Sequence, residues 1–287
     1  MTDYLRQGWR WLFPKLQRLI PANYGQPLLG KLDRAASVFH QLYENGNYDP
    51  ASNGEAWLLQ RLAELSPQIF FDVGANRGEY SRLALKASSQ ARVFAFKPIP
   101  PVFEELRSVL ALEPRAELHQ LALADQPGEL TFWLDSQNTG NTTAVDGVQD
   151  SIHGVKSPQK VNAHAQRLDL FCAEKMIEKI DLLKIDVEGF ESRVLQGGGK
   201  LLQDGSISCI QIEYGKANLF SRYFIHDYMR DYGENYVVGK LFPKGVQWFA
   251  QYSADLDDLL GPSLIMVLRN RSDLIKLLSH PGTAIAA

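Results

Sequence analysis

The chain has few cysteines. Its 287 residues include only Cys172 and Cys209, far apart and without a CxxC pair or a regular spacing. This excludes a disulfide framework of the kind that holds small secreted domains together. Both lie in segments that are predicted as helix and buried strand. We interpret them as small core residues in a reducing compartment, and we expect a cytoplasmic protein.

The chain also lacks a dominant charge and any long apolar run. Its net charge is -3, so it has no strongly basic surface, and no nucleic-acid partner is predicted. No apolar run approaches the roughly 20 residues that cross a bilayer. Arg6, Arg10, Pro14 and Lys15 interrupt any signal-peptide core. With 45% hydrophobic and 22% charged residues, the composition is that of a globular domain with a sizeable core.

Residues 1–65 are predicted to be mostly helical, with breaks at Pro14, Pro21 and Pro27. The first twenty residues mix aromatic and aliphatic side chains, including Trp9, with basic ones. Such a segment is suited to a membrane surface, where both types are favoured. It is equally suited to packing on the main domain or on a second subunit as a homodimer. We favour packing, because Pro14 would break a long amphipathic face.

Residues 69–101 have the clearest pattern in the chain. An apolar run at 69–73 predicts a buried parallel strand. Gly74 and Gly78 mark a turn, apolar residues then recur at helical spacing from Tyr80 to Ala87, and a second strand follows at 93–96. Such a unit places backbone N–H groups and a positive helix end at the end of a strand. A polar or anionic cofactor group can bind there.

Strands and helices continue to alternate along the chain. Further strands are predicted at 118–123, 130–134, 180–187, 207–212, 236–240, 246–250 and 264–268. Helices are predicted at 100–110, 189–202 and 222–232, the second weakened by three successive glycines. The polar region 135–166 has no clear period, and we interpret it as a long functional loop. This alternation predicts a doubly wound, parallel α/β sheet with right-handed crossovers.

Ligands bind such sheets outside the carboxyl ends of the strands. The candidate residues there are Asp72, Gly74, Asn76, Lys97, Asp186, Glu188 and Glu213. The first turn has the pattern DxGxxxG and departs from the dinucleotide fingerprint GxGxxG. A strand-ending aspartate with two glycines also has purely structural uses, so the turn alone does not establish a site.

Five segments together are more specific: FDVGANRGEYS, VFAFKPIP, NTGNTT, RLDLF and IDLLKIDVEGFESRVL. Their order and spacing over residues 66–270 resemble the FkbM family of S-adenosylmethionine-dependent methyltransferases. The resemblance implies a class I methyltransferase (Rossmann-like) doubly wound sheet with a reversed last strand. The N-terminal helical extension lies outside the resemblance, so we expect two domains, 1–65 and 66–287. The implied activity is O-methylation of a hydroxyl on a small molecule or glycan, such as a sugar or a secondary metabolite.

The resemblance also implies roles for single residues. Asp72 would face the ammonium of the cofactor's amino-acid end, and the turn amides from Gly74 to Gly78 would lie near its carboxylate. Asp125 would border the adenine. The implied cofactor-binding residues are Asp72, Gly74, Asn76, Gly78, Tyr80, Lys97, Asp125 and Asp186.

Methyl transfer also requires that the acceptor hydroxyl lose a proton. Asp186, Glu188, Glu213 or one of two loop histidines, His153 and His164, could accept it. Asp186 and Glu188 would point to opposite faces while their strand lasts, but Gly189 suggests a turn that brings both to the cleft. They could instead hold this turn together. They could also bind a hard metal ion, but no tight ligand motif is present, so no metal is predicted.

Lys97 departs from the family pattern, which usually has an acidic residue there. A carboxylate accepts hydrogen bonds from the ribose hydroxyls, whereas a lysine has donors only. Three alternatives follow: an active enzyme with Lys97 turned outward, a catalytically impaired binding protein, or an NADP-linked oxidoreductase with Lys97 on the 2′-phosphate. Asn76 and Glu79 stand where the dinucleotide fingerprint has glycines, which argues against the third.

Overall fold

The computed structural model describes residues 3–135, 137–261 and 263–282, with side chains from residue 11 onward. Arg6, Trp9 and Arg10 therefore lie outside the described side chains. The chain divides into two compact units, Met1–Gly46 and Asn47–Ala287. Helix α3 (Glu55–Ala63) belongs to the second unit. The domain boundary expected after residue 65 stays a prediction.

The first unit consists of helices α1 (Asp3–Ala22) and α2 (Pro27–Tyr43). Its helical character is confirmed, but the predicted break at Pro14 is wrong, because α1 continues through Pro14 and Pro21. An interior proline costs a helix about 3 kcal/mol without forbidding it. Pro27 begins α2, where its missing N–H group is not needed. None of the described helices is long and apolar enough to cross a membrane.

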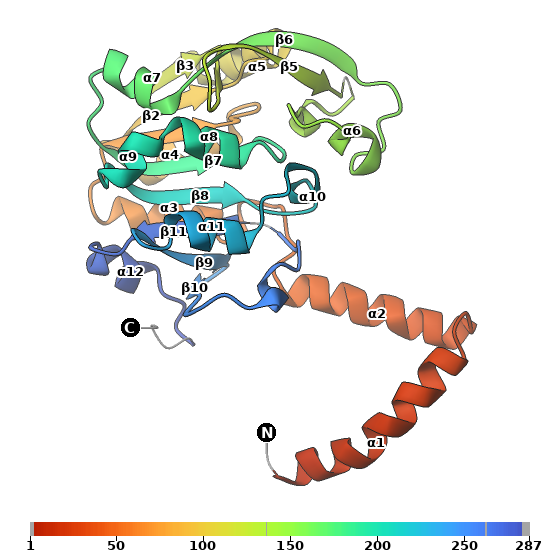
Figure 1. The fold of residues 1–287 in the computed structure, drawn as a ribbon. Coiled ribbons are helices and arrows are strands. Elements are labelled where there is room, and N and C mark those ends of the chain that lie inside the picture. Colours follow the sequence, from red (N-terminus) through yellow and green to blue (C-terminus); the bar gives the residue numbers. More distant parts are fainter. Residues whose placement is uncertain (1–2, 136, 262, 283–287) are drawn as a thin grey trace. The chain divides into compact units, whose positions relative to one another are not determined.

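The second unit is built around an eight-stranded sheet with the order β10-β9-β11-β8-β7-β1-β2-β3 (Figure 1). Its strands are β1 (Ile69–Val73), β2 (Arg92–Phe96), β3 (Ala116–His119), β7 (Ile180–Ile185), β8 (Ile207–Glu213), β9 (Tyr236–Phe242), β10 (Gly245–Trp248) and β11 (Ser263–Leu268). Strands β3, β2, β1, β7 and β8 pair in parallel. Strand β11 runs antiparallel to both β8 and β9. The predicted doubly wound sheet with a reversed last strand is confirmed.

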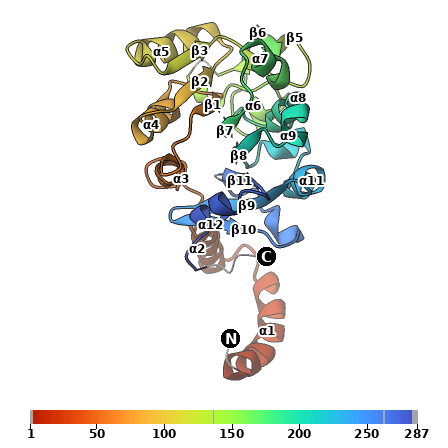
Figure 2. The same ribbon diagram turned by 90° about the vertical axis from the view of Figure 1, so that its left-hand side faces the viewer.

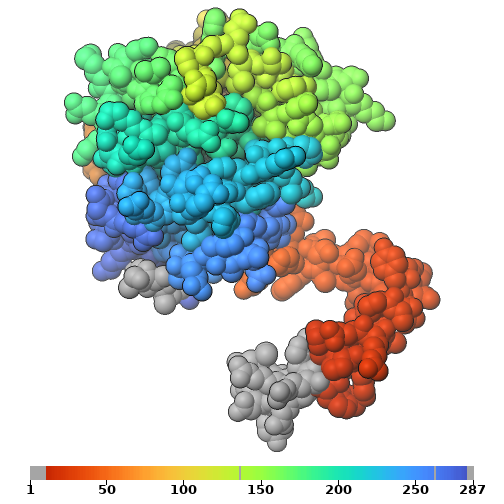
Figure 3. All heavy atoms as spheres, in the orientation of Figure 1, coloured from red at the N-terminus to blue at the C-terminus, as the bar shows by residue number. Residues whose placement is uncertain are grey.

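Helices cover both faces of this sheet (Figures 1 and 2). One face carries α7 (Leu168–Glu174), α8 (Glu191–Gly197), α9 (Gly199–Gln203) and α11 (Ile225–Tyr232). The other carries α3, α4 (Glu79–Ala87), α5 (Pro100–Leu110) and α12 (Ser272–Leu278). The connections contain the short helices α6 (Val148–Ser151) and α10 (Asn218–Ser221) and the 3-10 turns Thr139–Asn141 and Ala254–Leu256. In the space-filling view, α8, α9 and α11 close over the strands behind them (Figure 3).

Successive side chains of the central strands point to opposite faces of the sheet and pack into the core on each side. Phe71 and Phe94 pack with α7 and α8, whereas Phe70 and Val93 pack with α3 and α4. Burial on both faces explains why these strands have continuous rather than alternating apolar runs. Cys172 and Cys209 are both buried and free, which confirms their interpretation as core residues.

A separate three-stranded sheet, with the order β4-β6-β5, corrects two predictions. Its strands are β4 (Ala122–Leu123), β5 (Gly128–Leu134) and β6 (Gln159–Gln166). The single strand predicted at 118–123 is wrong, since β3 pairs with β2 and β4 pairs with β6. The region 135–166 is not one loop, because β6 occupies its last part and α6 its middle. Polar residues on the exposed side of β6 obscured its short apolar stripe, Val161, Ala163 and Ala165.

Candidate active site at the carboxyl ends of the strands

The candidate site lies where the strand order reverses, at the carboxyl ends of β1 and β7. Val73 at the end of β1 pairs with Phe96 of β2 on one side and with Ile185 of β7 on the other. Because these strands are parallel, the residues that follow them meet at one edge of the sheet. A ligand is expected at this position in an open α/β sheet.

Two tight turns meet at this edge. Gly74 has a φ of +90°, and a Cβ atom on it would lie 1.8 Å from the backbone oxygen of Asp186. The backbone N–H group of Asp186 donates to the Val73 oxygen at 2.9 Å. The turn after β1 and the turn after β7 therefore lie backbone against backbone. Gly74 is required for this approach, which supplies a structural reason for one glycine of the DxGxxxG pattern.

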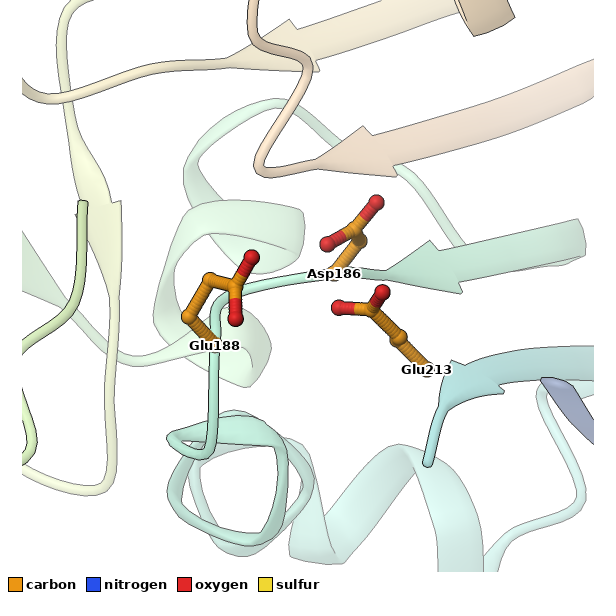
Figure 4. A group of neighbouring side chains, drawn as sticks. All are labelled: Asp186, Glu188 and Glu213. Carbon is orange, nitrogen blue, oxygen red and sulfur yellow. The ribbon is translucent and has the colours of Figure 1, made fainter. Parts of the chain in front are cut away.

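Three acidic side chains converge beside these turns (Figure 4). Asp186 follows β7, Glu188 lies in the next turn and Glu213 ends β8; one oxygen atom from each lies within 4.8 Å of the others. Glu188 reaches this cluster because its φ is +55° and that of Gly189 is +98°. A non-glycine residue with positive φ carries backbone strain, which is common at functional sites. His153 Nε2 lies 3.4 Å from a Glu188 oxygen.

The carboxyl groups of the acidic cluster affect one another's pKa. Burial and the charges of Asp186 and Glu188 raise the pKa of Glu213 well above its usual range. Burial also raises the pKa of Asp186, but the Lys184 ammonium, 2.7 Å away, the hydrogen bond with Glu213 and the charge of Lys97 together hold that pKa below its usual range. Two neighbouring carboxyls whose pKa values are pushed apart can share one proton, with Glu213 as the protonated member. Three acidic oxygens can also hold a hard divalent cation; the absence of a metal stays a prediction.

Lys97 faces this cluster from the end of β2. It is only 5% exposed, so the interpretation in which it turns outward is wrong. Burial lowers its pKa, while Asp186 and Glu188 act in the opposite direction. It lines a small cavity with apolar residues that include Ile99, Leu123 and Phe132. The lining of this cavity is thus mostly apolar.

A second, more polar cavity lies on the other side of Gly74. It is lined by Asn76, Tyr80, Lys184, Asp186 and Glu213, together with residues from the segment 48–55. The Tyr80 hydroxyl donates to Gln211 Oε1 at 2.6 Å, so it is already engaged within the protein. Gly78, with a φ of +86°, caps helix α4 next to this cavity.

Asp72 is 1% exposed, accepts from the Ser81 hydroxyl at 2.7 Å and is not among the described residues that line either cavity, so its predicted contact with the cofactor stays a prediction. Two further predicted residues lie elsewhere. Asp125 forms an ion pair with Arg193 at 3.0 Å and is not among the described residues that line either cavity. His164 is exposed on β6, paired with Glu129 across the three-stranded sheet. The structure thus brings His153, but not His164, to the acidic cluster.

Sequence reasoning missed two charged residues that shape the site. Lys184 Nζ contacts Asp186 and lies 3.8 Å from Asp72. Glu191 Oε1 accepts the backbone N–H groups of Val187 and Gly189 at 3.1 and 3.0 Å, and so holds the turn that carries Glu188. Burial raises the pKa of Glu191 to about 7. Lys184 could have been recognised from the sequence, because a lysine inside an otherwise apolar strand is unusual.

Comparison with known proteins identifies a family that contains this arrangement of residues. A family described as "Methyltransferase FkbM domain" matches residues 72–236, more than half of the chain. The chain belongs to the FkbM methyltransferase family. The match begins at Asp72 in β1 and ends in β9, so it contains the acidic cluster and both turns. The resemblance stated from the motifs is confirmed.

Among its relatives is the 2-O-methyltransferase NoeI of Sinorhizobium fredii, 25% identical over 65% of this chain and 79% of that protein. The 31-O-demethyl-FK506 methyltransferase FkbM of Streptomyces tacrolimicus is 30% identical over 48% of this chain and 63% of that protein. The hexuronic acid methyltransferase AglP of Haloferax volcanii is 26% identical, over 56% and 64%. The chain thus spans less than two thirds of the length of FkbM and AglP.

Solved structures with a similar fold are more distant. They include a putative rRNA methylase from Clostridium thermocellum, with a TM-score of 0.40 and 10% identity over 75% of this chain and 97% of that one. Another is SMU.1697c of Streptococcus mutans in complex with SAH, with a TM-score of 0.37 and 12% identity over 73% and 94%. The family match and the strand order, with β11 antiparallel to its neighbours, carry the assignment of the class I, Rossmann-like methyltransferase fold. The distant likenesses add nothing to it and say nothing about the site.

Proposed function

We propose that this FkbM-family methyltransferase transfers a methyl group from S-adenosyl-L-methionine to a hydroxyl of a small molecule or glycan. Family membership supports methyl transfer. The observation that carries the oxygen acceptor is the acidic cluster of Asp186, Glu188 and Glu213 with His153 beside it. A hydroxyl must lose its proton during transfer, and such groups can receive it.

The described residues fit the cofactor. Asn76 lines the polar cavity, and its Oδ1 is a buried acceptor without a hydrogen-bond partner, which suits a ligand with N–H donors. The carboxylates of the site suit a positively charged ligand. Ile99 and Phe132 of the smaller cavity are apolar side chains of the kind that contact an adenine ring. When bound, the cofactor supplies an activated methyl group on a sulfonium.

The protein's own contribution is alignment and proton removal. The turns at Gly74 and Asp186 fix the ligand against one edge of the sheet, and alignment can account for much of the barrier reduction in a bimolecular transfer. We assign proton acceptance to Glu188, with His153 placed to receive or relay the proton. Lys184 keeps Asp186 ionised beside them, while Glu213 stays protonated and donates to Asp186. This division follows from the opposite pKa shifts of Asp186 and Glu213.

The acceptor class is inferred from the relatives, whose names specify a 2-O position, 31-O-demethyl-FK506 and a hexuronic acid. We propose that the segment 139–145 shapes the acceptor pocket; the hydrogen bond from the Thr143 hydroxyl to the Glu188 backbone oxygen, 2.6 Å, supports this. In the N-terminal unit, Trp11, Leu19 and Phe39 are exposed. We also propose that this N-terminal extension contacts either a membrane or a second copy of the chain in a homodimer. Nucleic acid is not a proposed partner.

A second candidate function is a binding protein that has lost catalysis. It is favoured by Lys97, which is buried at the position where the family usually has an acidic residue. Incubation with methyl-labelled cofactor and a cell extract, followed by product mass analysis, separates the two. The enzyme adds one labelled methyl group to a hydroxyl compound, and Glu188→Gln strongly slows formation of this product. Cofactor binding without any product, over a wide range of extracts, would favour the binding protein.

A further inference from the structure

The polar cavity beside Gly74 is completed by a segment that precedes the family match. Tyr48, Pro50, Asn53 and Glu55 form one wall of this cavity. The opposite wall contains the turn after β1 and the cluster members Asp186 and Glu213. Its volume is about 130 Å³, well above the roughly 10–15 Å³ that holds one water molecule. The cavity can therefore receive a small polar group.

The wall is held rigidly against the sheet. Asn53 Oδ1 accepts the backbone N–H group of Glu55 at 2.9 Å. Gly54, with a φ of +110°, approaches β9 so closely that a Cβ atom on it would lie 2.5 Å from the Phe242 oxygen. Asn53 is 2% exposed and Glu55 8% exposed. A buried, hydrogen-bonded turn of this kind fixes the position of the Glu55 side chain.

A chain of hydrogen bonds orients the Glu55 carboxylate. Tyr80 donates to Gln211 Oε1 at 2.6 Å, which leaves the Gln211 amide group to donate to Glu55 Oε1 at 2.6 Å. The same amide group also donates to the Ser263 hydroxyl at 3.2 Å. No described lysine or arginine forms an ion pair with Glu55. Its second oxygen is thus left for another donor.

The charges around this cavity are unbalanced. Lys184 is the described basic side chain of the lining, and it contacts Asp186 and lies close to Asp72 behind it, whereas Glu55 and Asp186 are acidic and the protonated Glu213 adds no charge. Asn76 Oδ1 is buried without a hydrogen-bond donor. Buried carboxylates are costly unless a cation or several donors compensate them. A ligand with a positive charge and several N–H groups meets both needs.

We propose that the segment 48–55 recognises the ammonium of the cofactor's amino-acid end, with Glu55 as its charge partner. This inference rests on the proposed function, since S-adenosylmethionine and its demethylated product SAH both carry such an ammonium. It adds a binding subsite outside residues 72–236, the range of the family match. A primary ammonium has three N–H donors, enough for Glu55 and the neighbouring acceptors.

Calorimetric titration of Glu55→Gln with three ligands tests the subsite. Glutamine keeps the shape and the bond from Gln211 but loses the charge. Affinity for S-adenosylmethionine and SAH should fall about tenfold or more, as expected for loss of a charged hydrogen bond. Affinity for 5′-methylthioadenosine, which lacks the amino-acid end, should stay the same. Glu64→Gln is the matched control, because Glu64 follows the same helix and is exposed in a pair with Arg61.

Equal losses for all three ligands, or no loss for any, would overturn the subsite while leaving the proposed function intact. If the unaltered protein binds neither S-adenosylmethionine nor SAH, both fail. If Glu55→Gln does not fold, a measurement on the unaltered protein still tests the proposal. A SAH analogue without its amino group should bind about tenfold or more weakly than SAH, and equal binding would contradict ammonium recognition.

Discussion

Lys184 Nζ lies 2.7 Å from Asp186 Oδ2, and both residues belong to the same short stretch at the end of β7. The lysine side chain is 7% exposed and also approaches Asp72 on the neighbouring strand. One buried ammonium thus connects the first cofactor turn with the acidic cluster. Two of the five segments that carry the family resemblance, FDVGANRGEYS and IDLLKIDVEGFESRVL, thus meet at Lys184.

Replacing Lys184 should destabilise the protein. Lys184→Gln leaves Asp186 and Asp72 without their cation, and breaking a buried pair in this way typically costs about 3–5 kcal/mol. Because Asp186 is partly exposed, we expect a loss of about 3 kcal/mol in the free energy of unfolding, measured with urea at neutral pH. Lys200→Gln, which removes an exposed pair with Asp204, should change it by less than about 1 kcal/mol. Similar small losses in both variants would contradict the role of Lys184.

Removing the proposed proton acceptor should affect turnover more than binding. Glu188→Gln is expected to lower kcat by about 10²–10⁴-fold, as for loss of a general base, while the cofactor Kd changes little. His153→Ala should lower kcat as well, because His153 lies 3.4 Å from Glu188. His164→Ala is the matched control, since His164 is exposed on β6. If His164→Ala lowers kcat as much as His153→Ala, the assignment of His153 is wrong.

The role of Lys97 can be tested by replacing it with the acidic residue that the family usually has at this position. A glutamate in Lys97→Glu can accept from the ribose hydroxyls, so cofactor affinity should rise about tenfold or more. The same change adds a carboxylate that faces Asp186 and Glu188, and the free protein should lose stability. Calorimetry and thermal unfolding measure the two effects. Unaltered affinity would mean that position 97 does not contact the ribose.

Glu191 should make stability depend on pH. Burial raises its pKa in the folded protein to about 7, above its ordinary value of 4.5. A raised pKa stabilises the fold fully below the ordinary pKa, and this contribution is lost as the pH rises through 7. Between pH 4.5 and 8 the stability of the unaltered protein should therefore fall, relative to Glu191→Gln, by about 3 kcal/mol. Denaturant unfolding at several pH values measures the difference, and parallel curves would refute it.

Local patterns predicted the sheet well because its strands are short, apolar and buried on both faces. The unit of β1, α4 and β2 follows directly from residues 69–96. The turn at Gly189 correctly predicted that Glu188 reaches the cleft. Strand β6 was missed because its buried side consists of Val161 and small alanines. Its partner β4 is also distant in sequence, and local periodicity does not encode such pairing.

The sequence predicted only some of the site residues, because the others depend on contacts between distant parts of the chain. Asp186 and Glu213 could be located because strand ends in a parallel sheet share one edge. Glu55 could not, since it lies before β1 and its position at the cavity depends on contacts with distant strands, such as its bond with Gln211 on β8. Asp125 follows a strand end as predicted, but Arg193 of α8 binds its side chain. Both outcomes depend on tertiary contacts between residues more than sixty positions apart.

The central claim is that the edge of the sheet between Gly74 and Glu213 binds S-adenosylmethionine. Calorimetric titration of the unaltered protein with S-adenosylmethionine, SAH and NADP(H) tests it most directly. Binding of the first two at concentrations well below about 1 mM, without binding of NADP(H), is the predicted result. No binding of S-adenosylmethionine or SAH at about millimolar concentration would contradict the account.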